Sequence, residues 1–565
     1  MTRRPHFRWR IQGFTPHATE RQIDRMWEVV LLGAAVLLFG IHLGDVPLRD
    51  WDEGTVAQVA REIWRDPQSW LHPTLHGMPY TNKPPLVHGL IALAYQFGGV
   101  TESMARLPGA LLTALSVPLV YGIGRELWHR RSISIFAAFV YLTWLPVVRH
   151  GRLAMLDGAV LCFWTLLVWC SLRSRRDLRY TLGLGVAFGL ICLTKGVLLG
   201  GLLGSIVIGF LLWDTPRLLQ SAWFWGGLML GSFPAVGWYA AQFQHYGLAF
   251  WNGNLLSQSA ERVWSSVENH GGPPWYYLLE LLKYGFPGLV FVPEGFRTAW
   301  LERNLSWAKL LLVWGSVYFA AISVMGTKLP WYVLPLYPAL ALLCGVSIDG
   351  FWRDSTFWGM PDTSPKPYPK VWLGIFGVLA LVGWGASLVL ARQYFLKMPT
   401  VDANLVLALL TLALTMTLVV FLMLQRDAQM VVVLVWGSYL SMLLFVTSSQ
   451  WVWEVNEDYA VKPVAAMIRE ATDAPVLHTS HPYDRPSLNF YADRPVYSTS
   501  LQGLRSQWNE TSNPCLLLDR LALKALLLSK ADALDRAEGW YLLCRHEHPN
   551  LDRFVEHLEI DRPKI

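Results

Sequence analysis

Long apolar runs dominate the pattern of hydrophobic and polar positions along this chain, and shorter polar stretches separate them. A helix needs about 20 apolar residues to cross a bilayer, so runs near this length predict membrane spans. We expect spans at about 26–44, 104–125, 132–149, 155–172, 180–194, 196–213, 220–245, 275–293, 307–324, 331–348, 371–392, 403–424 and 429–447. The pattern therefore predicts a polytopic α-helical membrane protein.

Composition agrees with this prediction, since 53% of the 565 residues are hydrophobic and only 16% are charged. The N-terminus is basic and leads into the first apolar run, a pattern also found in signal peptides. That run is too long for the apolar core of a signal peptide, and no small-residue cleavage site follows it. We interpret it as an uncleaved first helix with its N-terminus in the cytoplasm.

One apolar stretch, residues 85–98, is short for a span and contains His88 and Gln96. If it does not cross the membrane, five loops containing Lys or Arg face the cytoplasm, as the positive-inside rule requires. These loops are 124–131, 171–179, 213–218, 296–304 and 424–429. If it did cross, the Arg-rich loops would face outward. We therefore place 85–98 flat on the outer surface with an amphipathic helix at about 52–65, which gives about 13 spans and an outer C-terminus.

Residues after Thr447 differ in composition from the preceding chain. Residues 450–565 are polar, and short apolar runs such as "APVLHT", "CLLLD" and "WYLLC" alternate with helical patterns such as "RLALKALLLSKADALDRA". This alternation predicts a small α/β domain. We therefore expect a transmembrane domain over 1–449, with an outer loop at 45–103, and an extracytoplasmic α/β domain over 450–565.

The six cysteines divide into two groups. Four lie inside apolar runs and are expected to be buried, namely Cys162, Cys170, Cys192 and Cys344. Cys515 and Cys544 lie in strand-like runs on the side where disulfides persist, so we hypothesise a disulfide between adjacent parallel strands joined by a crossover helix. No Cys-x-x-Cys motif is present, so a zinc ribbon is not expected.

The predicted topology brings charged residues from separate segments to the outer face of the membrane. Cations on this face run against the positive-inside rule, so we expect them to have a function there. A mainly cationic group with a few carboxylates suits a phosphate-bearing substrate. The residues concerned are Asp52, Lys83, Asp157, Lys195, His270 and Lys328.

Each of these residues also has an ordinary structural interpretation. Asp52 could be the N-cap of the helix at 52–65. Lys83 could extend to the lipid headgroups, although the two prolines after it hold its backbone stiff. Asp157 lies one turn inside a span, where an acid is costly unless it is paired or functional. Lys195 could be a membrane anchor, and His270 could be an ordinary surface histidine.

Further charges lie in or near the same segments. Arg149, His150 and Arg152 could bind the nearby carboxylate, a phosphate or lipid headgroups. Glu280 and Lys283 lie deeper in a predicted span, and their spacing of three allows an ion pair within one helix.

An ordered set of motifs in residues 26 to 350 resembles the lipid-linked-sugar glycosyltransferases of the GT-C class. The set consists of "WDEGTVAQVARE", "YTNKPPL", "RLAMLDG", "LTKG", "HGGPPWYY" and "KLPWYVLPLYP". Each motif alone is weak, but the order is specific. The chain is similar to the dolichyl-phosphate-mannose protein mannosyltransferases and, more closely, to the bacterial aminoarabinose transferases of lipid A. The resemblance implies a GT-C fold with juxtamembrane helices.

The resemblance also implies roles for matching residues. In the family, the acid at the position of Asp52 is the catalytic carboxylate, the acid at Asp157 supports the same site, and the lysine at Lys83 holds the phosphate of the donor with further cations. We accordingly assign to catalysis Asp52, Asp157 and Glu53, to phosphate binding Lys83, Lys195, Lys328 and Arg152, and to substrate binding Asn82, Tyr80, His270, Tyr332 and Tyr337.

One position departs from the aminoarabinose transferases, which have a Glu implicated in metal binding where this chain has Asn82. An amide is a poorer ligand than a carboxylate for a divalent cation. The sequence therefore gives no firm expectation of a bound metal ion. The same departure weakens any transfer of the family's acceptor to this chain.

The implied function is transfer of a sugar, with inversion, from a polyprenyl-phosphate donor to a lipid, glycan or protein acceptor at the outer face of the bacterial inner membrane. Membrane lipids are the other expected partners, and nucleic acid is not expected. Two alternatives come from other classes: a lipid or sugar transporter, and a scaffold whose outer domain binds a partner. Transporters often have repeated halves and polar residues near mid-membrane. Here no internal repeat is found, and most charges gather at one surface.

Overall fold

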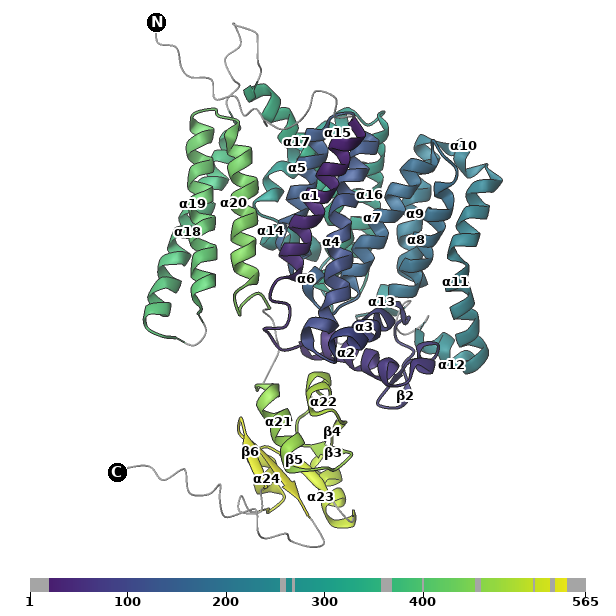
Figure 1. Ribbon diagram of the computed structural model, residues 1–565, viewed down its shortest axis with the longest axis vertical. Coiled ribbons are helices and arrows are strands. Elements are labelled where there is room, and N and C mark those ends of the chain that lie inside the picture. Colours follow the sequence, from purple (N-terminus) through teal and green to yellow (C-terminus); the bar gives the residue numbers. More distant parts are fainter. Residues whose placement is uncertain are drawn as a thin grey trace, which may run out of the picture. The chain divides into compact units, whose positions relative to one another are not determined.

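The computed structural model in Figure 1 describes residues 20–254, 261–266, 270–356, 368–398, 401–452, 459–511, 514–528 and 534–545. The chain forms two compact units. The membrane unit consists of residues 1–45 and 81–452, and the α/β unit consists of residues 46–80 and 453–565. Residues 46–80 of the first long loop thus belong to the same unit as the C-terminal segment, whereas the sequence pattern groups them with the transmembrane domain.

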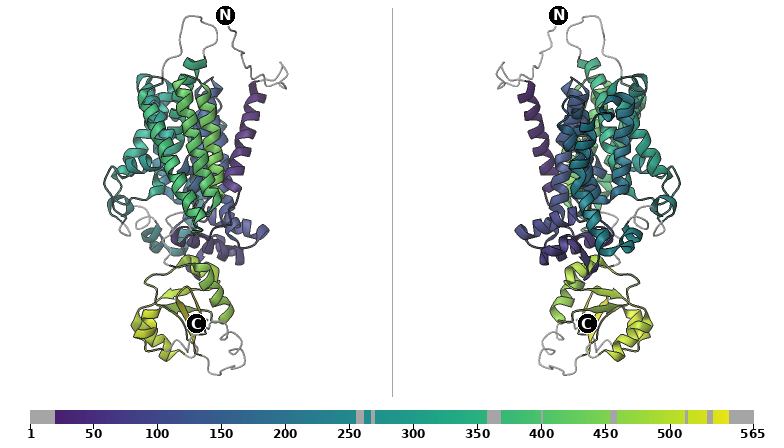
Figure 2. Two further views of the ribbon diagram at one scale, coloured as in Figure 1. Left: turned by 90° about the vertical axis from the view of Figure 1, so that its left-hand side faces the viewer. Right: turned by 90° about the vertical axis from the view of Figure 1, so that its right-hand side faces the viewer.

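Helices form most of the described part of the membrane unit, and the long ones run along a common direction (Figures 1 and 2). The first group comprises α1 (Glu20–Gly40), α3 (Leu86–Gly98), α4 (Glu102–Leu127), α5 (Arg131–Leu142), α6 (Leu145–Arg152), α7 (Asp157–Ser174), α8 (Tyr180–Lys195), α9 (Val197–Asp214), α10 (Pro216–Leu219), α11 (Ala222–Tyr246), α12 (Leu248–Phe250) and α13 (Glu261–Trp264). The second comprises α14 (Tyr276–Tyr284), η4 (Gly288–Phe291), α15 (Val292–Leu301), α16 (Ser306–Val324), η5 (Pro330–Leu336), α17 (Tyr337–Thr356), α18 (Lys370–Phe395), α19 (Ala403–Leu424) and α20 (Gln429–Val446).

Two predicted spans are broken, so the expectation of one continuous helix was wrong for both. Residues 132–149 form α5 and α6, which meet at an angle of 58°. Residues 275–293 form α14, then a break, then η4 and the start of α15. Proline explains both breaks, because it favours the first turn of a helix and disrupts an interior. Pro146 lies in the first turn of α6, and Pro287 precedes η4.

The number of spans differs from the expected thirteen. Seven helices in the described part of the chain are long and apolar enough to cross a membrane, or eight if α5 and α6 form one bent span. Several predicted spans fall short of that length, since α8 has 16 residues and α14 has nine. The count of thirteen therefore stays a prediction, whereas the many apolar helices agree with a polytopic membrane protein.

Ion pairs join the basic loops at one end of the membrane unit. Arg125 Nε and Arg131 Nε lie 3.1 Å and 2.7 Å from Oδ1 of Asp24, near the start of α1. Arg175, after α7, lies 2.8 Å from Asp214 at the end of α9. Arg173 Nε lies 2.7 Å from Oε1 of Glu126, which joins the end of α7 to the end of α4. The loops at 124–131, 171–179 and 213–218 therefore share one end of the helix bundle.

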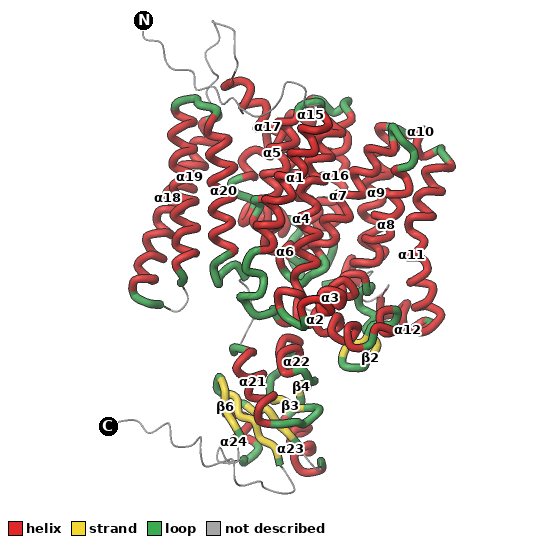
Figure 3. The backbone as a smooth tube through the Cα atoms, in the orientation of Figure 1, coloured by secondary structure: helices red, strands yellow, loops and turns green. Residues whose placement is uncertain are grey.

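The α/β unit contains both sheets of the described residues (Figure 3). β1 (Thr74–Leu75) and β2 (Met78–Pro79) form a short antiparallel hairpin after α2 (Asp50–Arg65) and η1 (Pro67–Trp70). The larger sheet has the order β4-β3-β5-β7-β6. Its elements in chain order are α21 (Val461–Ala471), β3 (Leu477–Thr479), α22 (Pro486–Ala492), β4 (Val496–Ser498), α23 (Leu501–Glu510), β5 (Cys515–Leu518), α24 (Arg520–Ala525), β6 (Asp535–Ala537) and β7 (Trp540–Cys544).

Side chains on the two faces of the larger sheet belong to separate apolar clusters. Leu517 packs with α21 and α22, whereas Leu516 and Leu518 pack with Leu504 and Leu523. This division follows from the alternation of side chains along a strand. The predicted α/β class is confirmed. The predicted long helix "RLALKALLLSKADALDRA" is wrong in part, because among its described residues Arg520–Ala525 form a helix, whereas Asp535–Ala537 form a strand.

The hypothesised disulfide is present, and it joins Cys515 to Cys544. The two strands are neighbours as expected, but they are antiparallel rather than parallel. The reason is the extra strand β6, which lies between β5 and β7 in the chain. It forms an antiparallel pair with β7, so the chain has reversed its direction when β7 pairs with β5. The four other cysteines are free and buried, as the sequence predicted.

Candidate functional site

The candidate residues fall into both units. Asp52, Glu53 and Tyr80 belong to the α/β unit, and the remaining candidates belong to the membrane unit. Each group is therefore described by itself, beginning with the helix that carries Asp52.

Helix α2 begins at Asp50 and has three acids in its first turn, Asp50, Asp52 and Glu53. Negative charge is favourable there because the unpaired N–H groups of a helix start carry partial positive charge. The N-cap is Arg49, with no capping side chain, so the interpretation of Asp52 as the N-cap is wrong. The Asp52 side chain is 25% exposed, and its Oδ2 lies 3.8 Å from Nη2 of Arg49. Asp52 thus presents a partly exposed carboxylate beside a guanidinium.

Glu53 and Tyr80 are both buried within the α/β unit. Glu53 is fully buried, and its Oε2 accepts a 2.9 Å hydrogen bond from the backbone N–H of Arg49. That bond satisfies an N–H group at the helix start, which explains a buried acid without a catalytic role. Tyr80 is buried, its backbone N–H donates to the Pro73 carbonyl, and burial raises the pKa of its phenol.

Asp157, Lys195 and Tyr332 meet in the membrane unit. Lys195 Nζ donates to Oδ1 of Asp157 over 2.5 Å, and the two side chains are 14% and 6% exposed. The same Nζ lies 5.7 Å from the ring centroid of Tyr332, close enough for a cation–π contact. These residues come from three separate segments. Two of them, Asp157 and Lys195, belong to the set that the sequence predicts to converge, and the structure brings these two together.

The positions of these three residues follow from where the local helices begin and end. Asp157 is the first residue of α7, and Lys195 is the last residue of α8. An acid at a helix start and a cation at a helix end both complement the helix dipole. Helix α8 stops there because Gly196 has a φ of 105°, a conformation that glycine adopts readily. Tyr332 lies within η5, the short helix that begins at Pro330 of "KLP".

Lys83 and Asn82 lie in the loop that leads into α3. Asn82 is exposed, Lys83 is half-buried, and the two prolines that follow are buried. Asn254 fixes this loop, since its Nδ2 donates to the Thr81 carbonyl at 2.6 Å and approaches the Asn82 carbonyl at 3.5 Å. Sequence reasoning did not single out Asn254, because no local pattern links it to a loop 172 positions earlier.

Lys328 is buried, and its ammonium donates to the carbonyls of Ile322 (2.9 Å) and Ser323 (2.7 Å) at the end of α16. Lys328 therefore satisfies two backbone carbonyls at the end of α16. His270 is exposed, and its carbonyl accepts from the Lys328 backbone N–H at 2.7 Å. The structure thus brings these two candidates together through their backbones.

Arg152 and Tyr337 are buried in the helix bundle. Arg152 Nη1 and Nη2 donate to the carbonyls of Leu38 and Ile41 near the end of α1, each at 2.7 Å. Its guanidinium also lies 4.5 Å from the ring centroid of Trp451. Tyr337 begins α17, and its ring meets Trp144 at 4.8 Å in an edge-to-face contact. Both side chains support packing.

The surroundings of Asn82 do not fit a divalent metal ion. The amide of Asn254 and the backbone carbonyls of Thr81 and Asn82 lie together here, and these are weaker ligands than carboxylates for a divalent cation. Across the described ranges, no three His, Cys, Asp or Glu side chains gather closely enough to hold a metal. We therefore derive no step through a metal.

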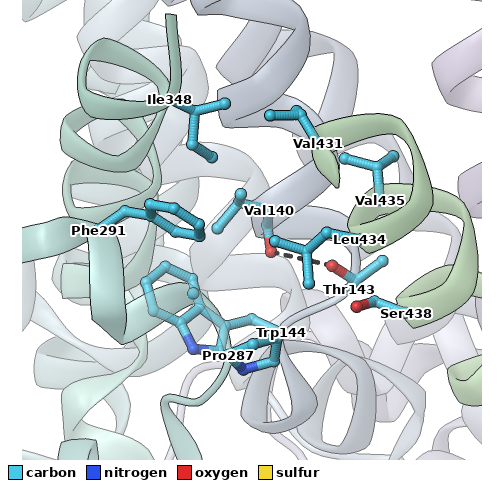
Figure 4. Close-up of a pocket in the computed structure, with 11 residues that line it drawn as sticks. Val140, Thr143, Trp144, Pro287, Phe291, Ile348, Val431, Leu434, Val435 and Ser438 are labelled. Carbon is cyan, nitrogen blue, oxygen red and sulfur yellow. Dashed lines mark hydrogen bonds between the residues drawn. The ribbon is translucent and has the colours of Figure 1, made fainter. Parts of the chain in front are cut away.

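An apolar pocket lies elsewhere in the membrane unit (Figure 4). Val140, Phe291, Ile348 and Leu434 are among its lining residues, which come from α5, η4, α17 and α20. None of the candidate residues lines it. Because it holds no charged group, this pocket offers no chemistry for a phosphate-bearing substrate.

Comparison with known families and curated proteins finds similarity over part of the chain. The family described as dolichyl-phosphate-mannose-protein mannosyltransferase matches residues 82–238. The chain is 30% identical over 341 residues to undecaprenyl phosphate-alpha-4-amino-4-deoxy-L-arabinose arabinosyl transferase 1 of Pseudomonas fluorescens (strain Pf-5), which covers 57% of this chain and 60% of the relative. A transferase of the same name from Pectobacterium carotovorum is 29% identical over 345 residues, 59% of this chain and 60% of the relative. The matched sequence thus spans less than two thirds of these relatives.

Comparison with solved structures extends the likeness to nearly the whole chain. The crystal structure of ArnT from Cupriavidus metallidurans bound to undecaprenyl phosphate matches with a TM-score of 0.73 and 19% identity, over 92% of this chain and 98% of that chain. The same protein in the apo state matches with a TM-score of 0.72. These matches show that the chain has the GT-C fold of ArnT, as the motif resemblance implied.

Proposed function

We propose that this protein is a membrane glycosyltransferase that moves a sugar from a polyprenyl-phosphate donor to an acceptor. The observation that carries the proposal is the fold, which the chain shares with an ArnT solved with undecaprenyl phosphate. The names of the curated relatives point to the same donor class. An undecaprenyl-phosphate-linked sugar is therefore the first donor to test, and lipid A the first acceptor, with glycans and proteins as alternatives.

In the proposed reaction, the bond between the anomeric carbon and the donor phosphate oxygen breaks, and a bond from an acceptor oxygen to that carbon forms. The departing group is the lipid phosphate, which carries the negative charge away. Lys83 and Lys195 neutralise that charge, because cations placed where charge develops lower the barrier. Asp52 accepts the proton of an acceptor hydroxyl as general base. If the acceptor is a phosphate, no base is needed, and Asp52 instead orients it or stabilises positive charge on the sugar ring.

The ion pair of Asp157 with Lys195 supports this assignment. A buried carboxylate requires a partner, and Asp157 fixes the ammonium at a helix end. Donation to Asp157 uses one of three N–H groups of Lys195, so two remain for contacts to other oxygens. The Tyr332 ring beside the ammonium completes its surroundings. Lys328 and Arg152 are assigned to completing helix ends, because backbone carbonyls already accept from their side chains.

The protein is proposed to act at the outer face of the bacterial inner membrane. Support comes from the ion pairs that join the basic loops at one end of the membrane unit. Basic loops favour the cytoplasmic side. The basic loop at 171–179 connects the end of α7 to the start of α8. Asp157 begins α7 and Lys195 ends α8, so each lies one helix length away from that loop.

The experiment is transfer by purified protein in detergent, with undecaprenyl-phosphate-linked aminoarabinose as donor and lipid A as acceptor. The expected result is free undecaprenyl phosphate together with glycosylated acceptor. Lys83→Ala should weaken donor binding, whereas Lys370→Ala, a change of an exposed lysine at the start of α18, should not. Movement of intact donor across vesicles without release of undecaprenyl phosphate would instead support the transporter alternative. Partner binding with neither activity would support a scaffold.

A further inference from the structure

Helix α2 approaches α22 within the α/β unit so closely that only glycine fits at position 54. A Cβ at Gly54 would lie 2.6 Å from the Ser487 backbone nitrogen and 2.9 Å from the Pro486 carbonyl carbon. Both are backbone atoms, so no side-chain rotation could relieve the contact. Ordinary van der Waals contact begins at 3.4 Å, so any larger residue must move the two helices apart by about 0.8 Å.

A buried ion pair fixes the start of α2 at this contact. Asp50 Oδ2 accepts from Arg485 Nε at 2.8 Å, and the two side chains are 8% and 1% exposed. Asp50 Oδ1 accepts from the Ser487 hydroxyl and, at 3.3 Å, from the Ser487 N–H. Arg485 is fixed in turn, since its Nη1 donates to the Tyr459 carbonyl at 3.2 Å. An ion pair buried in this way holds a defined geometry, because breaking it leaves an uncompensated charge.

The other end of α2 is fixed to the same helix of the α/β unit. Arg61 Nη1 lies 2.7 Å from Oδ1 of Asp493, and its Nη2 donates to the Phe490 carbonyl at 2.6 Å. The guanidinium also lies 4.1 Å from the centroid of the Phe490 ring. Arg61 is about three helical turns beyond Asp50, so contacts at both ends determine where α2 lies and how it is rotated.

The rotation of α2 about its own axis determines the direction in which the Asp52 side chain points. Residues two apart on a helix differ in direction by about 200°, so Asp50 and Asp52 point to opposite sides. Asp50 points into the α/β unit, and Asp52 remains 25% exposed.

We infer that the C-terminal α/β segment is a positioning element for the reaction, and that Asp50, Gly54, Arg485 and Ser487 set the direction of the Asp52 carboxylate. This inference rests on the proposed role of Asp52. It assigns a task in catalysis to a segment of the chain that otherwise contributes no candidate to the reaction.

The test compares kcat, donor KM and thermal stability for Gly54→Ala in the purified full-length protein. Gly385→Ala in α18, where a Cβ meets nothing within 4 Å, is the matched control. A displacement of about 1 Å at a catalytic group costs on the order of 10²-fold. We therefore expect Gly54→Ala to lower kcat by about that factor in the folded protein, with little change in donor KM, and Gly385→Ala to leave both unchanged.

Two milder variants cover the case in which Gly54→Ala does not fold. Ser487→Ala removes the hydroxyl donor to Asp50, and Arg485→Lys keeps the charge but loses the planar guanidinium. Both variants should lower kcat and leave donor KM nearly unchanged. Normal kcat per folded molecule in these variants, with only reduced thermal stability, would overturn the inference.

Asp52→Asn, measured in parallel, separates this inference from the proposed function. If Asp52→Asn is impaired while the positioning variants are normal, the positioning role is wrong and the function stands. If Asp52→Asn transfers normally, the role of Asp52 fails, and any loss in the positioning variants must act through another residue, which also overturns the inference.

Discussion

Two acids at the start of α2 show how burial separates roles that the sequence presents together. Asp50 and Asp52 belong to the same "DWDE" motif, yet Asp50 is 8% exposed and paired with Arg485, whereas Asp52 is 25% exposed. Local sequence predicts that acids cluster at the helix start, because they complement its dipole. Sequence cannot identify Arg485 as the partner, because 435 positions separate the pair.

The first prediction concerns Asp52. Asp52→Asn removes charge and basicity but keeps the size of the side chain. Since Asp52 is not the N-cap, the variant should fold normally, while kcat should fall about 10²–10⁴-fold if Asp52 is the general base. The control is Asp66→Asn, which alters an exposed acid after the other end of α2 whose Oδ1 accepts from the Gln68 N–H. Because Asn caps about as well as Asp, this control should transfer normally. Near-normal transfer by folded Asp52→Asn would refute the assignment.

The second prediction separates two tasks of Lys195. Lys195→Ala leaves Asp157 buried without its cation, and breaking a buried pair costs about 3–5 kcal/mol. We therefore expect a lower Tm and loss of transfer. Adding Asp157→Asn removes the unpaired charge and should restore much of the Tm. Transfer should stay low in the double variant, because the phosphate has lost its cation. Recovery of both properties would show that Lys195 serves only to neutralise Asp157.

At the level of helices and strands, long apolar runs predicted most helix boundaries well. Helices α4, α7, α8, α9, α16 and α19 begin and end within about three residues of the expected positions, because a membrane span must be long and apolar. Two kinds of feature were missed. Proline broke two expected helices, at α6 and before η4, and its effect depends on where neighbouring helices pack. Strand β6 was read as helix because "ADALDRA" has high helix propensity, and its pairing with β7 outweighs that preference.

The third prediction concerns Glu62, which fixes the β1–β2 hairpin to α2. Its carboxylate accepts from Thr74 Oγ1 and the His76 N–H, each at 2.6 Å. Burial raises the pKa of Glu62, but these hydrogen bonds outweigh it, so the folded pKa lies below the usual 4.5. A lowered folded pKa means that this stabilisation is complete above pH 4.5 and is lost as the pH falls through the folded pKa. Glu62→Gln should therefore lower the Tm near pH 6, and the difference from wild type should shrink towards pH 3.

The matched control for Glu62 is Glu470→Gln, which changes an exposed acid at the end of α21. Its Tm should follow that of wild type at each pH. A Tm difference for Glu62→Gln that grows as the pH falls would contradict the assignment of these hydrogen bonds to the ionised carboxylate.

Across the membrane unit, one buried arginine shows which helix ends lie together. Arg152, at the end of α6, donates to carbonyls at the end of α1 and, at 3.3 Å, to the Val446 carbonyl at the end of α20. The start of α1 lies at the opposite end of the unit, where Asp24 pairs with Arg125 and Arg131. The chain therefore leaves α20 at the end remote from the basic loops.

This arrangement yields the last prediction, an inner N-terminus and an outer C-terminal segment. Basic loops favour the cytoplasm, and the Cys515–Cys544 disulfide favours an oxidising compartment. A membrane-impermeant maleimide added to intact cells should label Leu521→Cys, a change at an exposed position of α24, but not His129→Cys in the loop before α5. The native cysteines give little background, since four are buried and two are bonded to each other. His129→Cys should react only after permeabilisation. Its labelling from outside would reverse the topology and place Asp157 and Lys195 on the cytoplasmic side, where a donor sugar presented at the outer face could not reach them.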